Sequence, residues 1–252
     1  MSSDTWNLTP DEWSNVLQSR DGSEAKKLAE ELKTKGYKLP WVRVVLDHAE
    51  DCSKVLDMGS GRGELGATLG MEGKDITLMD WSQDNLDFSK ELFHNLGLKG
   101  RFQQVDMTKA LPFKDGEFDL VYSCGVFEYF TDEQIRGILK EAFRIAKKRV
   151  IILVPNAWSL PYRFGKWYLE QKKQWVWGGE HPFPTLKPHF GTATRGVIKE
   201  FSVGTKHSLD FLSMRGGKLM RRVIETVFCL KDHSKPSLLN QGYLLITIGE
   251  KA

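Results

Sequence analysis

The sequence predicts an α/β protein with a doubly wound, mostly parallel sheet of seven strands, and three observations support this prediction. Short apolar runs alternate with amphipathic helical segments between residues 54 and 155. A glycine-rich turn directly follows the first apolar run. Two more strand-like runs follow later in the chain, and the last of them is expected to run antiparallel. Such alternation forms right-handed βαβ units, so we expect ligands at the carboxyl ends of the strands.

Each element has its own local signal. The five alternating strands are predicted at residues 54–58, 75–79, 101–105, 118–123 and 149–154. Ser82 can cap a helix that ends at Gly97, and Thr131-Asp-Glu-Gln134 forms a capping box before the next helix. Two helices are predicted before the sheet, at 23–35 and 41–48. Two closing strands are predicted after it, at 197–203 and 243–248, around a helix near 217–228.

Composition limits the class of protein and its surroundings. The 252 residues are 40% apolar and 27% charged, with a net charge of +3, which is typical of a globular protein. The start of the chain has no basic and apolar leader, and VIILV at 150–154 is too short to span a membrane, so we expect a soluble protein. The three cysteines include no Cys-x-x-Cys pair, which favours a reducing cytoplasm. The histidines are scattered, so no metal site is expected.

The stretch VLDMGSGRGELG, residues 55–66, contains two overlapping glycine patterns. From Gly61 it matches the G-x-G-x-x-G pattern of dinucleotide-binding proteins, and from Gly59 it forms Gly-Ser-Gly-Arg-Gly. A strand should lead straight into the first glycine, and the apolar run VLDM ends at Gly59. The register that begins at Gly59 is therefore favoured, and Gly66 is expected to let the helix pack closely on the sheet.

Asp57 indicates the charge of the ligand. A carboxylate two residues before the first glycine would repel a pyrophosphate and attract an ammonium group. The turn and the helix after it can still bind one carboxylate. A ligand with an ammonium, a carboxylate and a ribose is S-adenosylmethionine.

From these residues onward the sequence resembles the class I S-adenosylmethionine-dependent methyltransferases, especially their small-molecule branch related to methyltransferase type 11. The resemblance covers residues 54–155 and implies a Rossmann-like fold. VLDMGSGRG resembles the first motif of the family. It is followed by an acid at the end of strand two, an acid after strand three, and FDLVYSCGVFEYF as the fourth motif.

The resemblance implies a set of cofactor-binding residues. Asp80 would hold the ribose hydroxyls, Trp81 would cover the adenine, and Asp106 would meet the adenine amine. Packing is the alternative role of Trp81, and Cys124 is expected to be a small buried residue rather than a nucleophile. The complete predicted set is Asp57, Gly59, Ser60, Gly61, Gly63, Asp80, Trp81, Asp106, Met107, Ser123 and Cys124.

Methyl transfer from a sulfonium is an in-line displacement, so the protein mainly aligns the acceptor and excludes water. A nitrogen acceptor that arrives neutral needs no protein base, whereas an oxygen or carbon acceptor needs one. The candidates are Glu128, Tyr129, Glu180 and His181. Related sequences often carry histidine where this chain has Tyr129, which weakens a role carried over to that position. A surface loop histidine is the alternative interpretation of His181.

The resemblance also predicts a domain plan. Residues 1–40 are expected to form a helical lid and residues 41–252 the methyltransferase domain, with a substrate-cap insertion at about 156–195. Aromatic residues are frequent in this insertion, and basic residues lie between them. We expect an apolar or aromatic pocket with a cationic rim, and an aromatic or anionic small-molecule acceptor. A structural cap with its own small core is the compatible alternative.

Three other functions stay open. Aromatic and basic residues could bind RNA, but strand four ends in SCGVF and lacks the Asn/Asp-Pro-Pro-aromatic motif of base-amino methyltransferases, so a small molecule is favoured. The fold could also bind S-adenosylmethionine without transferring its methyl group. An NAD-dependent dehydrogenase is the third alternative. The sequence leaves the acceptor and the oligomeric state open.

Overall fold

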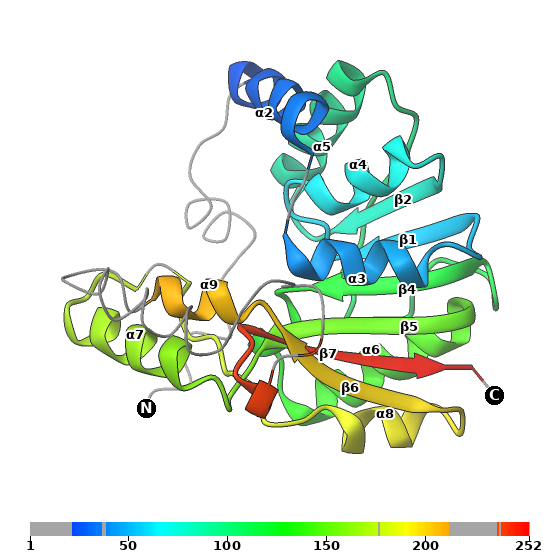
Figure 1. The fold of residues 1–252 in the computed structure, drawn as a ribbon. Coiled ribbons are helices and arrows are strands. Elements are labelled where there is room, and N and C mark those ends of the chain that lie inside the picture. Colours follow the sequence, from blue (N-terminus) through cyan, green and yellow to red (C-terminus); the bar gives the residue numbers. More distant parts are fainter. Residues whose placement is uncertain (1–21, 37–38, 176, 212–235, 237, 252) are drawn as a thin grey trace.

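A sheet of seven strands in the order β3-β2-β1-β4-β5-β7-β6 crosses the middle of the protein in this computed structural model (Figure 1). The structure describes residues 22–36, 39–175, 177–211, 236 and 238–251. Strands β1 to β5 are parallel, and β7 runs antiparallel between β5 and β6. The predicted fold class is therefore confirmed. The strands are β1 (Lys54–Met58), β2 (Asp75–Asp80), β3 (Arg101–Gln104), β4 (Phe118–Cys124), β5 (Ala146–Pro155), β6 (Ile198–Val203) and β7 (Leu244–Glu250).

Helices cover both faces of this sheet. On one face α3, α4 and α5 pack against the strands, and α2 packs on α5; α6 and α8 cover the other face (Figure 1). The helices are α2 (Gly22–Lys35), α3 (Pro40–His48), α4 (Glu64–Met71), α5 (Gln83–Leu96), α6 (Asp132–Ile145), α7 (Leu160–Gln171), α8 (Lys187–Ala193) and α9 (Thr205–Asp210), with short 3-10 turns η2 (Phe127–Tyr129) and η3 (Leu238–Asn240). Among the described residues, no helix is both long and apolar enough to cross a membrane.

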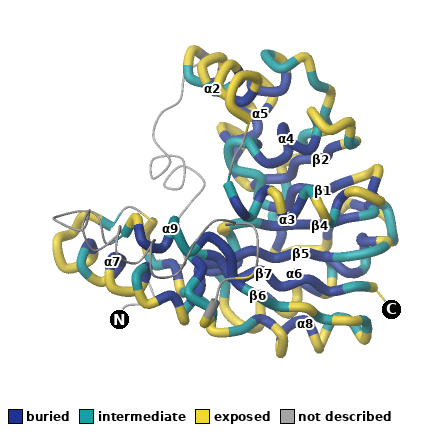
Figure 2. The backbone as a smooth tube through the Cα atoms, in the orientation of Figure 1, coloured by how far each residue is buried: buried dark blue, intermediate teal, exposed yellow. Residues whose placement is uncertain are grey.

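The central strands are buried from both sides, as Figure 2 shows. In β1, Val55 packs in the cluster beneath α4 and α5, whereas Leu56 and Met58 pack in the cluster beneath α6. This alternation follows from the pleat, which sends successive side chains to opposite faces. Asp57 shares the face of Val55 and is only 3% exposed. The sequence thus places a carboxyl group inside the apolar layer.

The predicted helix ends are confirmed where local side chains define them. The Ser82 hydroxyl accepts a hydrogen bond from the Asn85 backbone at 3.3 Å, and Gly97 ends α5 with φ +70°. Thr131 and Gln134 form both bonds of the capping box before α6. These signals lie within a few residues, so tertiary packing does not override them.

Strand β5 begins three residues before its predicted start. Ala146 pairs with Phe118, and the polar residues Lys147, Lys148 and Arg149 belong to the strand. The prediction included Arg149 but missed residues 146–148, because Lys147 and Lys148 are polar and Lys148 serves an ion-pair network instead of the core. The predicted helix near 217–228 lies outside the described residues, as does most of the predicted lid before α2.

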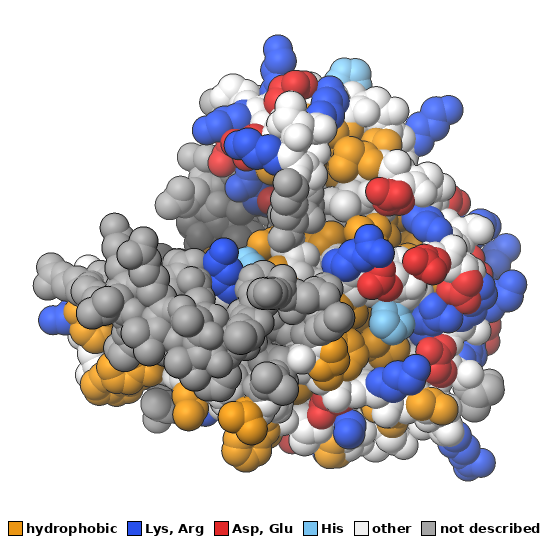
Figure 3. All heavy atoms as spheres, viewed as in Figure 1, with side chains coloured by type: hydrophobic (Ala, Val, Ile, Leu, Met, Phe, Trp, Pro, Cys, Tyr) orange, Lys and Arg blue, Asp and Glu red, His pale blue; other side chains and the backbone are white. Residues whose placement is uncertain are grey.

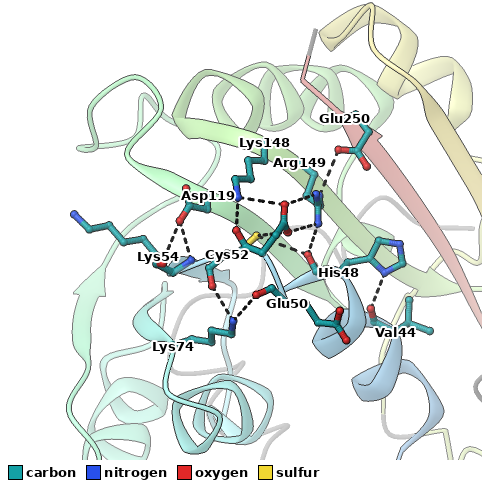
Figure 4. A network of polar contacts seen from close by, with 12 residues as sticks. Val44, His48, Glu50, Cys52, Lys54, Lys74, Asp119, Lys148, Arg149 and Glu250 are labelled. Atoms are coloured by element: carbon teal, nitrogen blue, oxygen red, sulfur yellow. Dashed lines mark hydrogen bonds and ion pairs between the residues drawn. The ribbon is translucent and has the colours of Figure 1, made fainter.

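This network lies near the amino ends of β1, β4 and β5 (Figure 4). The Asp51 carboxylate accepts hydrogen bonds from Arg149 at 2.8 and 3.1 Å and from Lys148 at 3.2 Å. Arg149 also donates to the His48 carbonyl at 2.5 Å and contacts Glu250 at 3.4 Å. One guanidinium therefore connects α3, β5 and β7.

We expect Asp51→Asn to lower the free energy of unfolding at pH 7 by about 1 kcal/mol, since the carboxylate is half-exposed and solvent screens its ion pairs. Burial raises the pKa of Asp51, but hydrogen bonds from Lys148, Arg149 and Cys52 outweigh it and lower the pKa to about 2. A lowered pKa stabilises the fold above the unfolded value of about 4, and this contribution is lost as the pH falls toward 2.

Thermal unfolding between pH 7 and pH 3 checks this prediction, with Asp75→Asn, an exposed aspartate at the start of β2, as the matched control. The difference in melting temperature between wild type and Asp51→Asn should become smaller as the pH falls. A gap that stays constant across this range would contradict it.

Candidate functional site

The glycine turn occupies the carboxyl end of β1, where the strand ends at Met58 and α4 begins at Glu64. Gly59, Gly61 and Gly63 all have positive φ, at +78°, +52° and +75°. The backbone amides of Gly59 and Ser60 donate to the Met79 carbonyl at 2.8 and 3.0 Å, which ties the turn to β2. The strand thus leads directly into Gly59, as the favoured register requires.

Two of these glycines are required for different physical reasons. A Cβ on Gly59 would lie 2.7 Å from Val126 Cγ2, so this position excludes a side chain for lack of space as well as for its φ. A Cβ on Gly61 would meet no heavy atom of the described residues within 4 Å, so only its φ requires glycine there. Gly66, inside α4, brings the helix so close to the sheet that its Cβ would lie 3.2 Å from Leu78 and 3.3 Å from Asp57.

Gly59→Ala should destabilise the protein more than Gly61→Ala. Gly61→Ala costs about 1 to 2 kcal/mol for the left-handed backbone alone. Gly59→Ala has the same backbone cost and adds a clash with Val126. Urea denaturation measures both costs. Adding Val126→Ala to Gly59→Ala should recover part of the loss, and equal stabilities of the two single variants would contradict the prediction.

Asp57 is the last residue but one of β1, and Asp80 is the last residue of β2. Asp80 accepts hydrogen bonds from the Gly61 amide at 2.8 Å, the Ser82 amide at 2.8 Å and the Asn85 side chain at 3.2 Å. The Oδ2 atom of Asp80 can still accept a hydrogen bond from one more donor. Burial raises the pKa of Asp57 to about 7, and the negative charge of Asp80 adds to this, against a hydrogen bond from Tyr122 that lowers it.

The remaining predicted cofactor residues surround the same loop. A Cβ on Gly59 would lie 3.2 Å from Met107 Cε, so Met107 borders the turn. Trp81 is half-exposed beside Asp80. The Asp106 carboxylate accepts from the Thr108 hydroxyl at 2.6 Å and pairs with Lys109 at 3.2 Å, so a ligand would compete for it. Cys124 ends β4, and burial raises the pKa of its thiol, which keeps it protonated and argues against a nucleophile.

Two buried hydroxyl groups at this site have no hydrogen-bond partner in the described part of the chain. They are Ser60 Oγ, in the glycine turn, and Ser123 Oγ, at the end of β4. An unpaired buried hydroxyl costs free energy that a ligand can recover. These orphan groups fit a polar ligand that lies across the ends of β1 and β4.

The candidate acid-base residues gather on η2 and the insertion that faces it. The Glu128 carbonyl accepts from the His181 amide at 2.9 Å, and the Tyr129 hydroxyl donates to the Trp177 carbonyl at 2.9 Å. The Glu180 carboxylate accepts a short hydrogen bond from Tyr162. The structure therefore joins Glu128 and Tyr129 to the segment that carries Glu180, while the His181 side chain itself is exposed.

Glu128 is the most perturbed of these groups. Its side chain is 2% exposed, and its Oε2 has no hydrogen-bond partner in the described residues. Burial raises the pKa of Glu128 well above its usual range, and the nearby Glu180 adds to this effect. Burial likewise raises the pKa of Glu180. A carboxyl group in such a setting holds its proton to higher pH than an exposed one and is a candidate for proton transfer.

Sequence reasoning missed several residues that support the site. Tyr122 lies beside Asp57 because the two residues are paired in the β1 and β4 register. Asn85 and Ser89, one turn apart on α5, bind Asp80 and the Gly61 carbonyl. Their i, i+4 spacing after Ser82 is a signal that could have placed them on the face of α5 toward the loop.

The strand order, the glycine turn after β1 and the acids near the ends of β1 and β2 are those of the class I S-adenosylmethionine-dependent methyltransferase fold. The methyltransferase domain family matches residues 55–149. This part of the chain is thus similar to a methyltransferase domain, and the fold is the one that such domains adopt.

Individual methyltransferases are similar to this chain. The ubiquinone/menaquinone biosynthesis C-methyltransferase of Pseudoalteromonas translucida is 35% identical over 104 residues, which cover 40% of this chain and 41% of that protein. An S-adenosylmethionine-dependent methyltransferase from Archaeoglobus fulgidus has a TM-score of 0.59 at 20% identity, covering 88% of this chain and 97% of its own. The magnesium protoporphyrin IX methyltransferase of Synechocystis PCC 6803, with bound S-adenosylhomocysteine, has a TM-score of 0.57 at 14% identity, covering 96% and 94%. The chain spans about half the length of the curated relatives it matches.

Proposed function

We propose that this chain transfers the methyl group of S-adenosylmethionine to a small-molecule acceptor. The observation that carries the proposal is the site around the glycine turn, where a buried Asp57, a hydrogen-bonded Asp80 and the orphan hydroxyls of Ser60 and Ser123 lie at the carboxyl ends of β1, β2 and β4. A carboxylate for an ammonium and a second carboxylate for ribose hydroxyls match polar groups of this cofactor.

Each predicted residue then has a physical role. Asp57 would pair with the ammonium of the cofactor, Asp80 would accept from its ribose, and Trp81 would lie against its adenine. Bound S-adenosylmethionine would supply an electrophilic methyl group. The protein's own contribution is to position the acceptor and to exclude water.

Glu128 is the group we assign to the acceptor's proton. Its carboxylate would accept the proton that an oxygen or carbon acceptor loses as it is methylated, and His181 and Tyr129 are the next candidates. Because Glu128 and Glu180 are both buried acids, they support an acceptor with hydroxyl or amine donors over an anionic one. Tyr129 and Trp177 in the same region support an aromatic acceptor.

The cellular setting follows from the thiols. Cys52 and Cys124 are free, and we propose that the protein works in a reducing cytoplasm.

A comparison of ligands tests the proposed cofactor. S-adenosylhomocysteine should raise the melting temperature of the protein, whereas NAD should not, because a protein is stabilised only by a ligand that binds its folded state. Stabilisation by NAD alone would reject the proposal in favour of a dehydrogenase.

A second measurement separates catalysis from binding. With methyl-labelled S-adenosylmethionine and a cell metabolite extract, label should move to a small molecule, and S-adenosylhomocysteine should accumulate. Cofactor binding with no transfer to the extract or to total RNA would indicate a non-methylating binding protein. Transfer to RNA alone would indicate an RNA methyltransferase.

A further inference from the structure

The outward side of α7 is apolar, which is unusual for a surface helix. Leu160, Phe164 and Trp167 follow one another at spacings of four and three residues, so they lie on the same side of the helix. Their exposed fractions are 72%, 57% and 53%, and the rings of Phe164 and Trp167 are 5.8 Å apart. The opposite side of α7 buries Tyr162 and Leu169, so the exposed stripe is not needed for the core.

The apolar surface extends beyond the helix. Trp158, just before α7, and Trp177, shortly after it, are also large exposed side chains, at 57% and 46%. Figure 3 shows hydrophobic side chains along the lower left edge of the protein, at the place of α7 in Figure 1. Several large apolar side chains exposed on one edge of a protein mark an interaction surface.

The charges on this segment are basic. Arg163, Lys172 and Lys173 are exposed, and none of them forms an ion pair within the described ranges of the chain. Glu170, the acid of α7, is paired with Lys166 at 2.8 Å. The exposed charge beside the apolar stripe is therefore positive.

We propose that α7 docks on the surface of an anionic lipid bilayer. Leu160, Phe164 and Trp167 would enter the interfacial layer, where tryptophan and other amphipathic rings are favoured. Arg163, Lys172 and Lys173 would meet the lipid phosphates, which attract basic residues close to an apolar anchor. The aliphatic Leu160 in the stripe has no ring with which to stack on a base, and this favours lipid over nucleic acid.

Docking through α7 would orient the candidate site. The segment that carries the stripe also contains Trp177. The backbone carbonyl of Trp177 accepts a hydrogen bond from the hydroxyl of Tyr129, which lies on η2. A bilayer bound to α7 would thus lie close to the acid-base residues, so an amphipathic acceptor could reach them from the lipid. This last step rests on the proposed function, whereas the docking itself does not.

Flotation of the full chain with lipid vesicles tests the docking. The protein should float with vesicles that contain phosphatidylglycerol, and binding should weaken at high salt and with pure phosphatidylcholine. The triple variant Leu160→Ser, Phe164→Ser, Trp167→Ser should lose roughly tenfold or more of its vesicle affinity, and Lys172→Glu with Lys173→Glu should lose a similar part.

Val197→Ser with Met71→Ser is the matched control, because it removes exposed apolar side chains from other elements. It should bind vesicles as the wild type does. Melting temperatures with S-adenosylhomocysteine should agree among all variants, which separates a failure of docking from a failure of folding or of cofactor binding. Wild-type protein that stays unbound, binds phosphatidylcholine equally well, or binds unchanged in the triple variant would overturn the proposal. A wild-type dimer that the triple variant dissociates would overturn it too, because a second copy would then cover α7.

Discussion

Asp57→Asn should weaken binding of S-adenosylhomocysteine roughly a hundredfold or more, because it removes a buried carboxylate that pairs with the ammonium of the ligand. Isothermal titration measures this loss. The wild-type affinity should rise with pH through about 7, since burial first and the charge of Asp80 next raise the pKa of Asp57 to about 7, and the ammonium requires the ionised form. The affinity of the variant should not follow this titration.

The same substitution should make the free protein more stable. A pKa of about 7 in the folded state lies above the unfolded value of about 4, so the folded state holds the proton longer. Stability contributed by the protonated group is present below pH 4 and is lost as the pH rises through 7. The neutral amide of the Asp57→Asn variant avoids this loss, so the variant should gain about 2 to 4 kcal/mol at pH 8 and little at pH 4.

Urea denaturation of the ligand-free protein at both pH values measures this gain, with Asp75→Asn as the exposed control. A variant that is less stable than wild type at pH 8 would show that Asp57 is not desolvated in the way that the structure describes. Unchanged ligand affinity would remove Asp57 from the cofactor site.

The second large effect is expected for Glu128→Gln. Turnover of the acceptor should fall by about two to four orders of magnitude, which is typical for the loss of a general base. The affinity for S-adenosylhomocysteine should stay within about twofold, because Glu128 is assigned to the acceptor and not to the cofactor. Release of S-adenosylhomocysteine, followed with the acceptor found by labelling, gives the rate.

The pH profile distinguishes a base from a structural acid. Burial raises the pKa of Glu128 well above its usual range. The fraction of Glu128 that is ionised and can accept a proton therefore increases as the pH rises through that raised pKa. Wild-type turnover should increase with pH over this range, and the turnover of Glu128→Gln should not. Glu91→Gln, an exposed glutamate on α5, is the matched control.

His181 offers the contrasting outcome. If Glu128→Gln keeps its turnover while His181→Ala loses it with cofactor affinity intact, the base is His181. Full turnover in both variants would favour a nitrogen acceptor that arrives neutral, and would remove the base from the mechanism.

Local signals predicted the fold well. The strand before Gly59, the caps at Ser82 and Thr131 and the stop at Gly97 depend on neighbours within a few residues, and the structure confirms each of them. The antiparallel β7 is also confirmed. Sequence patterns define such features because backbone geometry and hydrogen bonds act over short range.

The candidate site was only partly predictable, because its partners come together through tertiary packing. Glu180 and Tyr162 lie 18 residues apart in the insertion, and their contact depends on how that segment folds back. Tyr122 reaches Asp57 through the register of two strands that are far apart in sequence. The strongly raised pKa of Glu128 follows from burial, which residue type alone does not reveal. The assigned roles of these residues stay predictions.

The position of β7 affects how the protein folds during its synthesis. This strand lies between β5 and β6, so the sheet stays split until residues 244–250 have been synthesised and have left the ribosome. Before that point, β6 and one side of β5 have no partner, and unpaired strand edges promote association between chains. We therefore expect the nascent chain to depend on holding chaperones until β7 has emerged.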